Sequence, residues 1–303
     1  MPKTYNNTTR EMEKRNILIT GANGQLGREM RKVLDGDIFV NAIYTDVDEL
    51  DITDAQAIDN CITSNNVHFI VNCAAYTAVD AAESNVELCA KLNVEAPTLL
   101  AQSAHKHGAK LVHISTDYVF DGTCYRPYRE DDPMCPTSVY GKTKADGERH
   151  IMDVAPESII IRTAWLYSPH GKNFVKTMLA LGKEKEKLRV VCDQVGTPTY
   201  ALDLASIVKT FIDCEEWHPG IYHFSNEGAI SWYDFTLAIH RIAGITTCHV
   251  LPCMTKDYPT PATRPHYSVL DKTKIKSTLG IEIPHWEESL EQCINILTTD
   301  NKI

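Results

Sequence analysis

The stretch ILITGANGQLGREM, residues 17–30, joins a short apolar run to a glycine-rich turn and then to a helical pattern. Gly21, Gly24 and Gly27 follow the spacing G-x-x-G-x-x-G, one residue wider at its start than the common dinucleotide fingerprint. Glycines permit a tight turn and close approach of the backbone to a ligand, and a helix N-terminus favours an anion. Because the turn follows a strand and opens a helix, we interpret it, with Gln25 and Leu26, as a pyrophosphate cradle rather than an ordinary glycine turn.

Apolar runs and helical patterns alternate outward from this turn. Strands are expected at 17–20, 37–45, 68–75, 110–120 and 158–165, with helices at 28–34, 53–66, 95–108 and from Ser138 onward. Such alternation implies right-handed β-α-β units and a parallel sheet, and uninterrupted apolar runs imply strands covered on both faces. The predicted fold is α/β, a Rossmann-type doubly wound parallel sheet with a smaller, mostly C-terminal α/β substrate domain.

Beyond Trp165 the alternation is less regular. We expect a disordered tail at 1–15, a dinucleotide-binding domain at 16–165 and a mostly substrate-binding domain at 166–303, with the ligand in the crevice between the two domains. The strands near 189–194 and 220–226 are candidates to return to the first domain. The proline-rich segment 254–271 is expected to form a long ordered loop or a lid.

Composition excludes several classes of protein. A net charge of −10 and a pI near 5.6 leave no electrostatic footprint for nucleic acid, and no apolar run approaches the roughly 20 residues of a membrane span. The ten cysteines contain no C-x-x-C pair, and the cluster of Cys248, His249 and Cys253 lacks a second pair of ligands at zinc-finger spacing. We therefore expect no metal, no nucleic acid, no membrane, and a reducing, cytoplasmic setting.

The choice between NADH and NADPH depends on two residues of opposite charge. Asp46 follows Gly27 by 19 positions and ends the second strand, where an acidic residue holds the adenine ribose. Arg28 directly follows the last glycine and could attract a 2′-phosphate. Both cofactors therefore remain open from the sequence.

The stretch SVYGKTKADGE, residues 138–148, places Tyr140 and Lys144 four apart on a helix for which Ser138 is a plausible N-cap. This pair has two interpretations. It could belong to a solvated face rich in charge, since Y-x-x-x-K is a common chance match. Alternatively, Tyr140 is a general acid, because a nearby cation favours the phenolate and tunes proton transfer toward neutral pH.

Several motifs together resemble the extended short-chain dehydrogenase/reductases, and within them the dTDP-4-dehydrorhamnose reductases. They are TGANGQLG (20–27), LDITD (50–54), NCAAYTAVDAAE (72–83), STDYVFDG (115–122), VYGKTKADGE (139–148), RTAWLY (162–167), DQVGTPT (193–199) and PTPATRP (259–265). The resemblance runs from about residue 15 to about residue 300. The glycine turn and Y-x-x-x-K identify the superfamily, whereas YTAVDAAE, STDYVFDG and DQVGTPT are more specific to the reductases.

The resemblance implies reduction of the C4 ketone of a nucleotide sugar by NADPH or NADH, as in the synthesis of dTDP-L-rhamnose. It favours the general-acid interpretation: Tyr140 protonates the carbonyl oxygen, and the Thr116 hydroxyl binds the same oxygen. Lys144 is expected to lower the Tyr140 pKa and to bind the nicotinamide ribose.

Further roles follow only from the resemblance. Asp51 and Ile52 match positions at the adenine, and Ala74, Ala75 and Tyr76 match the strand end beneath the adenosine. The expected substrate contacts are Asp117, Trp165 and Arg264. Asn93 matches a structural asparagine.

The sequence also departs from the family pattern. Ala164 replaces a frequent serine and Val195 a common aromatic residue, and both changes could alter the sugar pocket. Some members dimerise through magnesium held by glutamates, but only Glu29 matches, so the sequence does not support magnesium and leaves a monomer or a homodimer. Two alternatives remain. One is a non-catalytic, cofactor-binding subunit resembling the regulatory subunit of methionine adenosyltransferase, and the other is a different nucleotide-sugar oxidoreductase or epimerase.

Overall fold

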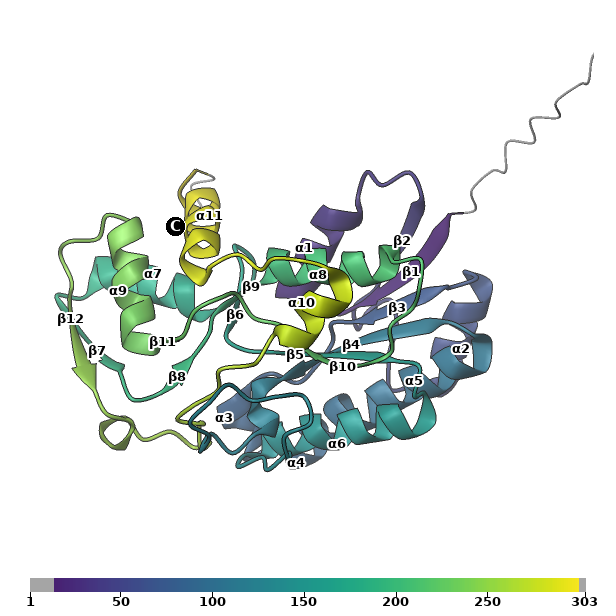
Figure 1. Ribbon diagram of the computed structural model, residues 1–303, viewed down its shortest axis with the longest axis horizontal. Coiled ribbons are helices and arrows are strands. Elements are labelled where there is room, and N and C mark those ends of the chain that lie inside the picture. Colours follow the sequence, from purple (N-terminus) through teal and green to yellow (C-terminus); the bar gives the residue numbers. More distant parts are fainter. Residues whose placement is uncertain (1–13, 300–303) are drawn as a thin grey trace, which may run out of the picture.

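A six-stranded parallel sheet forms the centre of the computed structural model, which describes residues 14–299 (Figure 1). Its order is β10-β5-β4-β3-β1-β2. The strands are β1 (Arg15–Thr20), β2 (Val40–Tyr44), β3 (Phe69–Asn72), β4 (Lys110–Thr116), β5 (Ile159–Thr163) and β10 (Gly220–His223). Strand order reverses between β1 and β3, and the glycine turn leaves β1 at this point. Open α/β sheets bind ligands at such a switch point.

Helices cover both faces of the sheet, as the apolar strands predict. The helices α1 (Gln25–Leu34) and α8 (Ala201–Asp213) lie on one face, and α2 (Ala55–Ser64), α5 (Ala96–His107) and α6 (Val139–Val154) lie on the other. Along β1, Ile17 and Ile19 pack in the core on the α1 side, and Leu18 packs in the core beneath α2 and α5. The predicted α/β fold is confirmed.

Local chemistry explains where the elements begin. The Ser138 side chain accepts a hydrogen bond from the Gly141 amide (3.1 Å), so it caps α6 as the sequence predicts. The strand expected at 37–45 is shorter, because Ile38 and Phe39 are exposed and β2 begins at Val40. Short elements connect the larger ones: α3 (Val79–Ala82), α4 (Val86–Ala90), the π-helix η1 (Lys91–Glu95) and the 3₁₀ helix η2 (Asp117–Val119).

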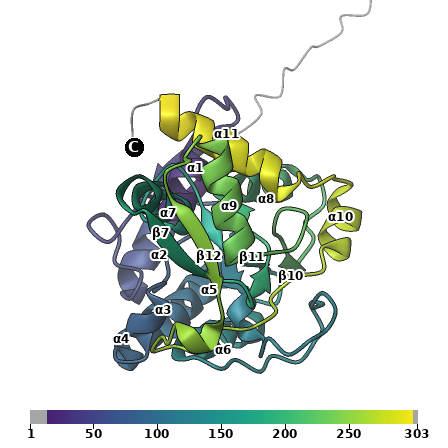
Figure 2. The same cartoon turned by 90° about the vertical axis from the view of Figure 1, so that its left-hand side faces the viewer.

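Most of the C-terminal elements gather beside the carboxyl edge of the sheet, at the left of Figure 1 and facing the viewer in Figure 2, whereas α10 (Thr273–Leu279) packs against β10. The helices are α7 (Phe174–Glu184), α9 (Trp232–Ile242), η3 (Thr255–Asp257), α10 (Thr273–Leu279) and α11 (Trp286–Thr299). The short strands pair as β6 (Leu166–Tyr167) with β9 (Thr199–Tyr200), β8 (Val195–Gly196) with β11 (Ile230–Ser231), and β7 (Lys187–Val191) with β12 (His249–Cys253).

Of the two strands considered as candidates to return to the first domain, β10 extends the large sheet, whereas β7 pairs with β12 outside it. The division at residue 165 stays a prediction, and the tail expected at 1–15 lies almost wholly outside the described residues. Between residues 14 and 299, no helix is long and apolar enough to cross a membrane.

Candidate active site

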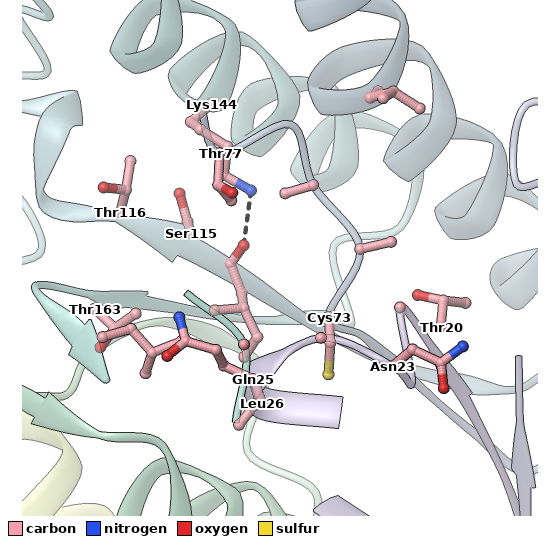
Figure 3. Close-up of a pocket in the computed structure, with 18 of the residues that line it drawn as sticks. Thr20, Asn23, Gln25, Leu26, Cys73, Thr77, Ser115, Thr116, Lys144 and Thr163 are labelled. Carbon is pink, nitrogen blue, oxygen red and sulfur yellow. Dashed lines mark hydrogen bonds between the residues drawn. The ribbon is translucent and has the colours of Figure 1, made fainter. Parts of the chain in front are cut away.

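A cavity of about 880 Å³ lies at the carboxyl ends of the parallel strands. Thr20 from the end of β1, Thr116 from β4 and Thr163 from β5 line it, as Figure 3 shows. Trp165 and Asn173 from the second half of the chain complete its wall. The cavity is therefore built from both halves of the molecule, at the position expected for a ligand.

The three glycines of the turn have different surroundings. Gly21 has a φ of +62°, and a Cβ there would lie 2.8 Å from the Ala74 amide nitrogen. A Cβ on Gly27 would lie 2.4 Å from the Gly21 carbonyl oxygen, so this glycine packs the helix against its own turn and does not line the cavity. Gly24 lines the cavity and caps α1 without a side chain.

The glycine turn fits a dinucleotide. A Cβ on Gly24 would meet only the Gly21 carbonyl oxygen, at 3.2 Å, so its other side is open toward the cavity. The first amides of α1 have no side-chain cap there, and Gln25 and Leu26 also line the cavity. An uncapped helix N-terminus beside small residues is suited to pyrophosphate.

Asp46 and Arg28 both bind the backbone of Asn23. The Asp46 carboxylate accepts from the Asn23 amide (3.0 Å), and the Arg28 guanidinium donates to the Asn23 carbonyl (3.0 Å). Asp46 lines the cavity, whereas Arg28 is exposed outside its wall. The two opposite charges thus lie at the same end of the site.

Of the residues expected at the adenosine, all but one lie in the cavity wall. Asp51, Ile52, Ala74 and Ala75 line the cavity. The Asp51 carboxylate accepts hydrogen bonds from the Thr53 hydroxyl (2.7 Å) and amide (2.8 Å), which lower its pKa. Tyr76 does not line the cavity; its amide donates to Asn93 (2.8 Å), and its carbonyl accepts from Asn93 (3.1 Å). Asn93 thereby holds the loop after β3.

Tyr140 lies in the cavity wall in the first turn of α6. Burial raises the pKa of its phenol above the ordinary value, and a hydrogen bond with Thr116 opposes the rise. The expectation that Lys144 lowers this pKa is therefore wrong for the protein alone, because desolvation disfavours the phenolate more than its neighbours favour it. The phenol stays protonated at neutral pH.

Lys144 lies one turn further along α6, and only about 1% of the residue is exposed. Its amine donates to the Ile114 carbonyl (2.7 Å), shown by the dashed line in Figure 3, and lies 3.1 Å from Nε2 of His113. Burial lowers the pKa of Lys144 to about 8. The nearest hydrogen-bonding partners of Lys144 are thus on β4.

Thr116 and Asp117 form a polar pair where β4 ends. The Thr116 hydroxyl donates to the Asp117 carboxylate (2.9 Å) and accepts from the Tyr118 amide (3.2 Å). Burial raises the pKa of Asp117 to about 6, although hydrogen bonds from Ser268 and Thr116 oppose the rise. The pair places one hydroxyl and one carboxyl group beside Tyr140 in the cavity wall.

Trp165 lines the cavity with a strained backbone. Its φ is +49°, a left-handed value that is rare for a bulky residue. Its ring stacks on Trp232, with centroids 3.5 Å apart and an angle of 10° between the rings. Strain of this kind persists where packing enforces it, often at functional sites. The stack holds the Trp165 ring in the cavity wall.

Arg264 does not line the cavity in this structure. Its guanidinium donates to both oxygens of Asp80 (2.7 and 3.0 Å), and Oδ1 of Asp80 also accepts from the Ala262 amide (3.2 Å). The bridge ties the proline-rich loop to α3. The substrate contact of Arg264 stays a prediction.

Three polar residues escaped prediction: Asn72, Asp80 and His113. His113 interrupts the apolar run KLVHIS, which is a signal that sequence reasoning could have used.

Glu29 is buried and its carboxyl oxygens have no hydrogen-bond partner among the described residues. Burial raises its pKa. Within residues 14–299 no group of three or more His, Cys, Asp or Glu side chains could hold a metal ion.

Comparison with known proteins bears on the whole described chain. The family model "RmlD substrate binding domain" matches residues 15–299. A dTDP-4-dehydrorhamnose reductase of Aggregatibacter actinomycetemcomitans is 43% identical over 284 residues, which cover 91% of this chain and 97% of that protein. The crystal structure of a dTDP-4-dehydrorhamnose reductase from Clostridium acetobutylicum is 47% identical with a TM-score of 0.90, and covers 93% of this chain and 99% of that one.

A third relative was solved with a cofactor. The dTDP-4-dehydrorhamnose reductase of Bacillus anthracis, in complex with NADP, is 38% identical with a TM-score of 0.89, again over 93% of this chain and 99% of that one. The family match covers the glycine turn, the Tyr140–Lys144 helix and the C-terminal elements alike. The chain therefore belongs to the RmlD substrate binding domain family, whose reductase members it resembles in both sequence and fold.

Proposed function

We propose that this chain reduces the C4 ketone of dTDP-4-dehydro-L-rhamnose to give dTDP-L-rhamnose, a precursor of cell-surface polysaccharide, with NADPH or NADH as the reductant. The chain is an oxidoreductase of the same class as its reductase relatives. The observation that carries the proposal is the shared cavity: Tyr140, Lys144 and Thr116 line one wall, and the glycine turn lines another part of the same space.

Each residue at the site has a separate role in the reaction. When bound, the nicotinamide supplies the hydride. Tyr140 donates its proton to the ketone oxygen as negative charge develops there, and its raised pKa keeps that proton available at neutral pH. The Thr116 hydroxyl is a second donor for the same oxygen, which stabilises the developing charge. Lys144 binds the nicotinamide ribose.

The remaining assignments concern the substrate and the choice of cofactor. Asp117 and Trp165 contact the hexose, and Arg264 binds the nucleotide part after leaving Asp80. Asp46 favours NADH by repelling a 2′-phosphate, and Arg28 favours NADPH by attracting one. Both reduced cofactors are therefore usable.

We further propose that residues 16–165 mainly hold the cofactor and residues 166–303 mainly hold the substrate. The protein acts as a monomer or a homodimer, and we include no metal in its site. Its ten cysteines are all free thiols, which suits the reducing cytoplasm.

A direct assay tests the proposal. The protein is incubated with reduced cofactor and dTDP-4-dehydro-L-rhamnose, and cofactor oxidation is followed together with formation of dTDP-L-rhamnose. We expect turnover well above the rate without protein. If folded protein that binds cofactor gives no turnover, the chain is a non-catalytic cofactor-binding subunit instead.

A further inference from the structure

A chain of buried hydrogen bonds runs from the end of β1 to Lys144. The Thr20 hydroxyl (2.7 Å) and the Ala74 amide (3.2 Å) both donate to Oδ1 of Asn72. The side-chain amide nitrogen of Asn72 lies 3.0 Å from Nδ1 of His113, and Nε2 of His113 lies 3.1 Å from the Lys144 amine. Asn72 and His113 are each no more than 1% exposed.

The donors in this chain fix the tautomer of His113. A backbone amide can only donate, so Ala74 requires Oδ1 of Asn72 on its side, and the Asn72 NH₂ group must face His113. That group also only donates, so Nδ1 of His113 must accept. Burial holds the pKa of His113 well below its usual value, so the ring is neutral. A neutral ring that accepts at Nδ1 carries its hydrogen on Nε2.

The tautomer in turn determines what His113 offers to Lys144. The Nε2–H group is a donor, and an ammonium group has only donors, so the two would oppose each other across 3.1 Å. A neutral amine accepts from Nε2–H and still donates to the Ile114 carbonyl, 2.7 Å away. All the hydrogen bonds in the row from Thr20 to Lys144 are satisfied only when Lys144 is neutral.

The other titratable groups around Lys144 do not reverse this preference. Glu148 and Cys89 favour the ammonium form, but burial outweighs both. Glu148 is already bound by the buried Arg162 at distances of 2.7 to 3.1 Å. Tyr140, on the same helix, stays protonated and uncharged at neutral pH.

We propose that His113 is a positioning residue: locked by Asn72 as its Nε2–H tautomer, it favours the neutral amine of Lys144 over the ammonium form until the cofactor binds. The ribose hydroxyls of a bound cofactor offer Lys144 acceptors that favour the ammonium form. Since the pKa of Lys144 is about 8, cofactor binding near that pH therefore takes up part of a proton. The inference rests on the proposed function for the identity of the ligand, but the tautomer itself does not depend on it.

The first test needs no ligand. Nitrogen NMR of the histidine rings in the whole protein, with His113 assigned by its loss in His113→Gln, reports which ring nitrogen carries hydrogen. We expect hydrogen on Nε2 and a neutral ring at pH 7. Hydrogen on Nδ1, or a charged ring, would overturn the proposal whether or not the protein binds a cofactor.

The second test counts protons during binding. NADPH is titrated calorimetrically at pH 8 in buffers of different ionisation enthalpy, and the wild type is expected to take up about half a proton, since the pKa of Lys144 is about 8. In Asn72→Asp the carboxylate accepts from Thr20, Ala74 and Nδ1–H of His113, so Nε2 becomes an acceptor for an ammonium group. Uptake should then approach zero, and the NMR signal should move to the Nδ1–H tautomer.

The matched control is Thr20→Ala, which removes one hydrogen bond from the chain but leaves Ala74 to orient Asn72. Its tautomer, read by NMR without any ligand, should equal that of the wild type. Wild-type uptake near zero, or an Asn72→Asp protein that keeps both the wild-type uptake and the Nε2–H tautomer, would contradict the proposal. If neither NADPH nor NADH binds, the proposed function fails, and the NMR result still decides the tautomer.

Discussion

A side chain would have different surroundings at Gly24 and at Gly27. Substitutions at these two glycines therefore test cofactor binding and folding stability separately. A side chain on Gly24 would enter the space beside the uncapped start of α1 and block pyrophosphate. We expect Gly24→Val to weaken NAD(H) and NADP(H) together by at least about tenfold, or about 1.4 kcal/mol, while the protein stays folded. Calorimetric titration and circular dichroism measure the two effects.

Gly27→Ala is the matched control, because its Cβ would lie 2.4 Å from the Gly21 carbonyl oxygen, inside the turn. We expect it to lower the free energy of unfolding by about 1–3 kcal/mol, as overpacking does. A folded Gly24→Val protein with normal affinity for cofactor would show that the turn is only structural.

Asp46 and Arg28 set the choice of cofactor at the same residue scale. Asp46→Ala removes a charge that repels a 2′-phosphate and should shift the ratio of kcat/KM severalfold toward NADPH. Arg28→Ala should shift it severalfold toward NADH. Each variant also loses a hydrogen bond to Asn23, so both absolute affinities can fall and the ratio is the informative quantity. An unchanged ratio in both variants would place the ribose elsewhere.

At the scale of elements, a buried ion pair joins the catalytic helix to the sheet. Arg162 on β5 and Glu148 on α6 are each about 1% exposed and 2.7 Å apart, and Ser115 on β4 also donates to Glu148. Arg162→Met leaves a buried charge without its partner, so unfolding free energy should fall by about 3–5 kcal/mol.

The double variant Arg162→Met/Glu148→Gln removes the uncompensated charge while keeping an acceptor for Ser115, and it should recover much of that loss. Denaturant unfolding of the two proteins measures the difference. A single variant that loses less than about 1 kcal/mol, the range of exposed pairs, would mean that the pair is not desolvated in solution.

The elements themselves were largely predictable from sequence. The glycine turn, the apolar strands and the Ser138 cap are local patterns, and each lies where the sequence predicts. The pairing of strands that lie far apart in the sequence was not predictable. Nothing in the run RVVCDQ indicates that this strand pairs with β12 rather than with the large sheet.

The same limit holds for the candidate site at the scale of the whole molecule. Tyr140, Lys144 and Thr116 were found because motifs mark them. His113 was missed because its contact with Lys144, 31 residues away, exists only after folding. The Asp80–Arg264 bridge spans 184 residues. The direction of the Tyr140 pKa was wrong because burial, which dominates it, depends on the packed cavity rather than on the neighbouring lysine.

The central claim is that both halves of the molecule build one cavity in which Tyr140 protonates a ketone. Turnover of dTDP-4-dehydro-L-rhamnose by the wild type and by Tyr140→Phe tests it most directly. Tyr222→Phe is the control, because Tyr222 lies on β10 outside the cavity wall and its phenol bonds to the His218 carbonyl and Thr278. Since the Tyr140 pKa is raised in the protein without ligands, wild-type kcat/KM for the cofactor, which reports the free enzyme, should not fall through phenol ionisation anywhere between pH 6 and 9. We predict that Tyr140→Phe folds, binds cofactor and loses about 10²–10⁴ in kcat across that range, while Tyr222→Phe keeps its rate. Wild-type turnover in Tyr140→Phe would contradict the account, because the proton would then come from another group.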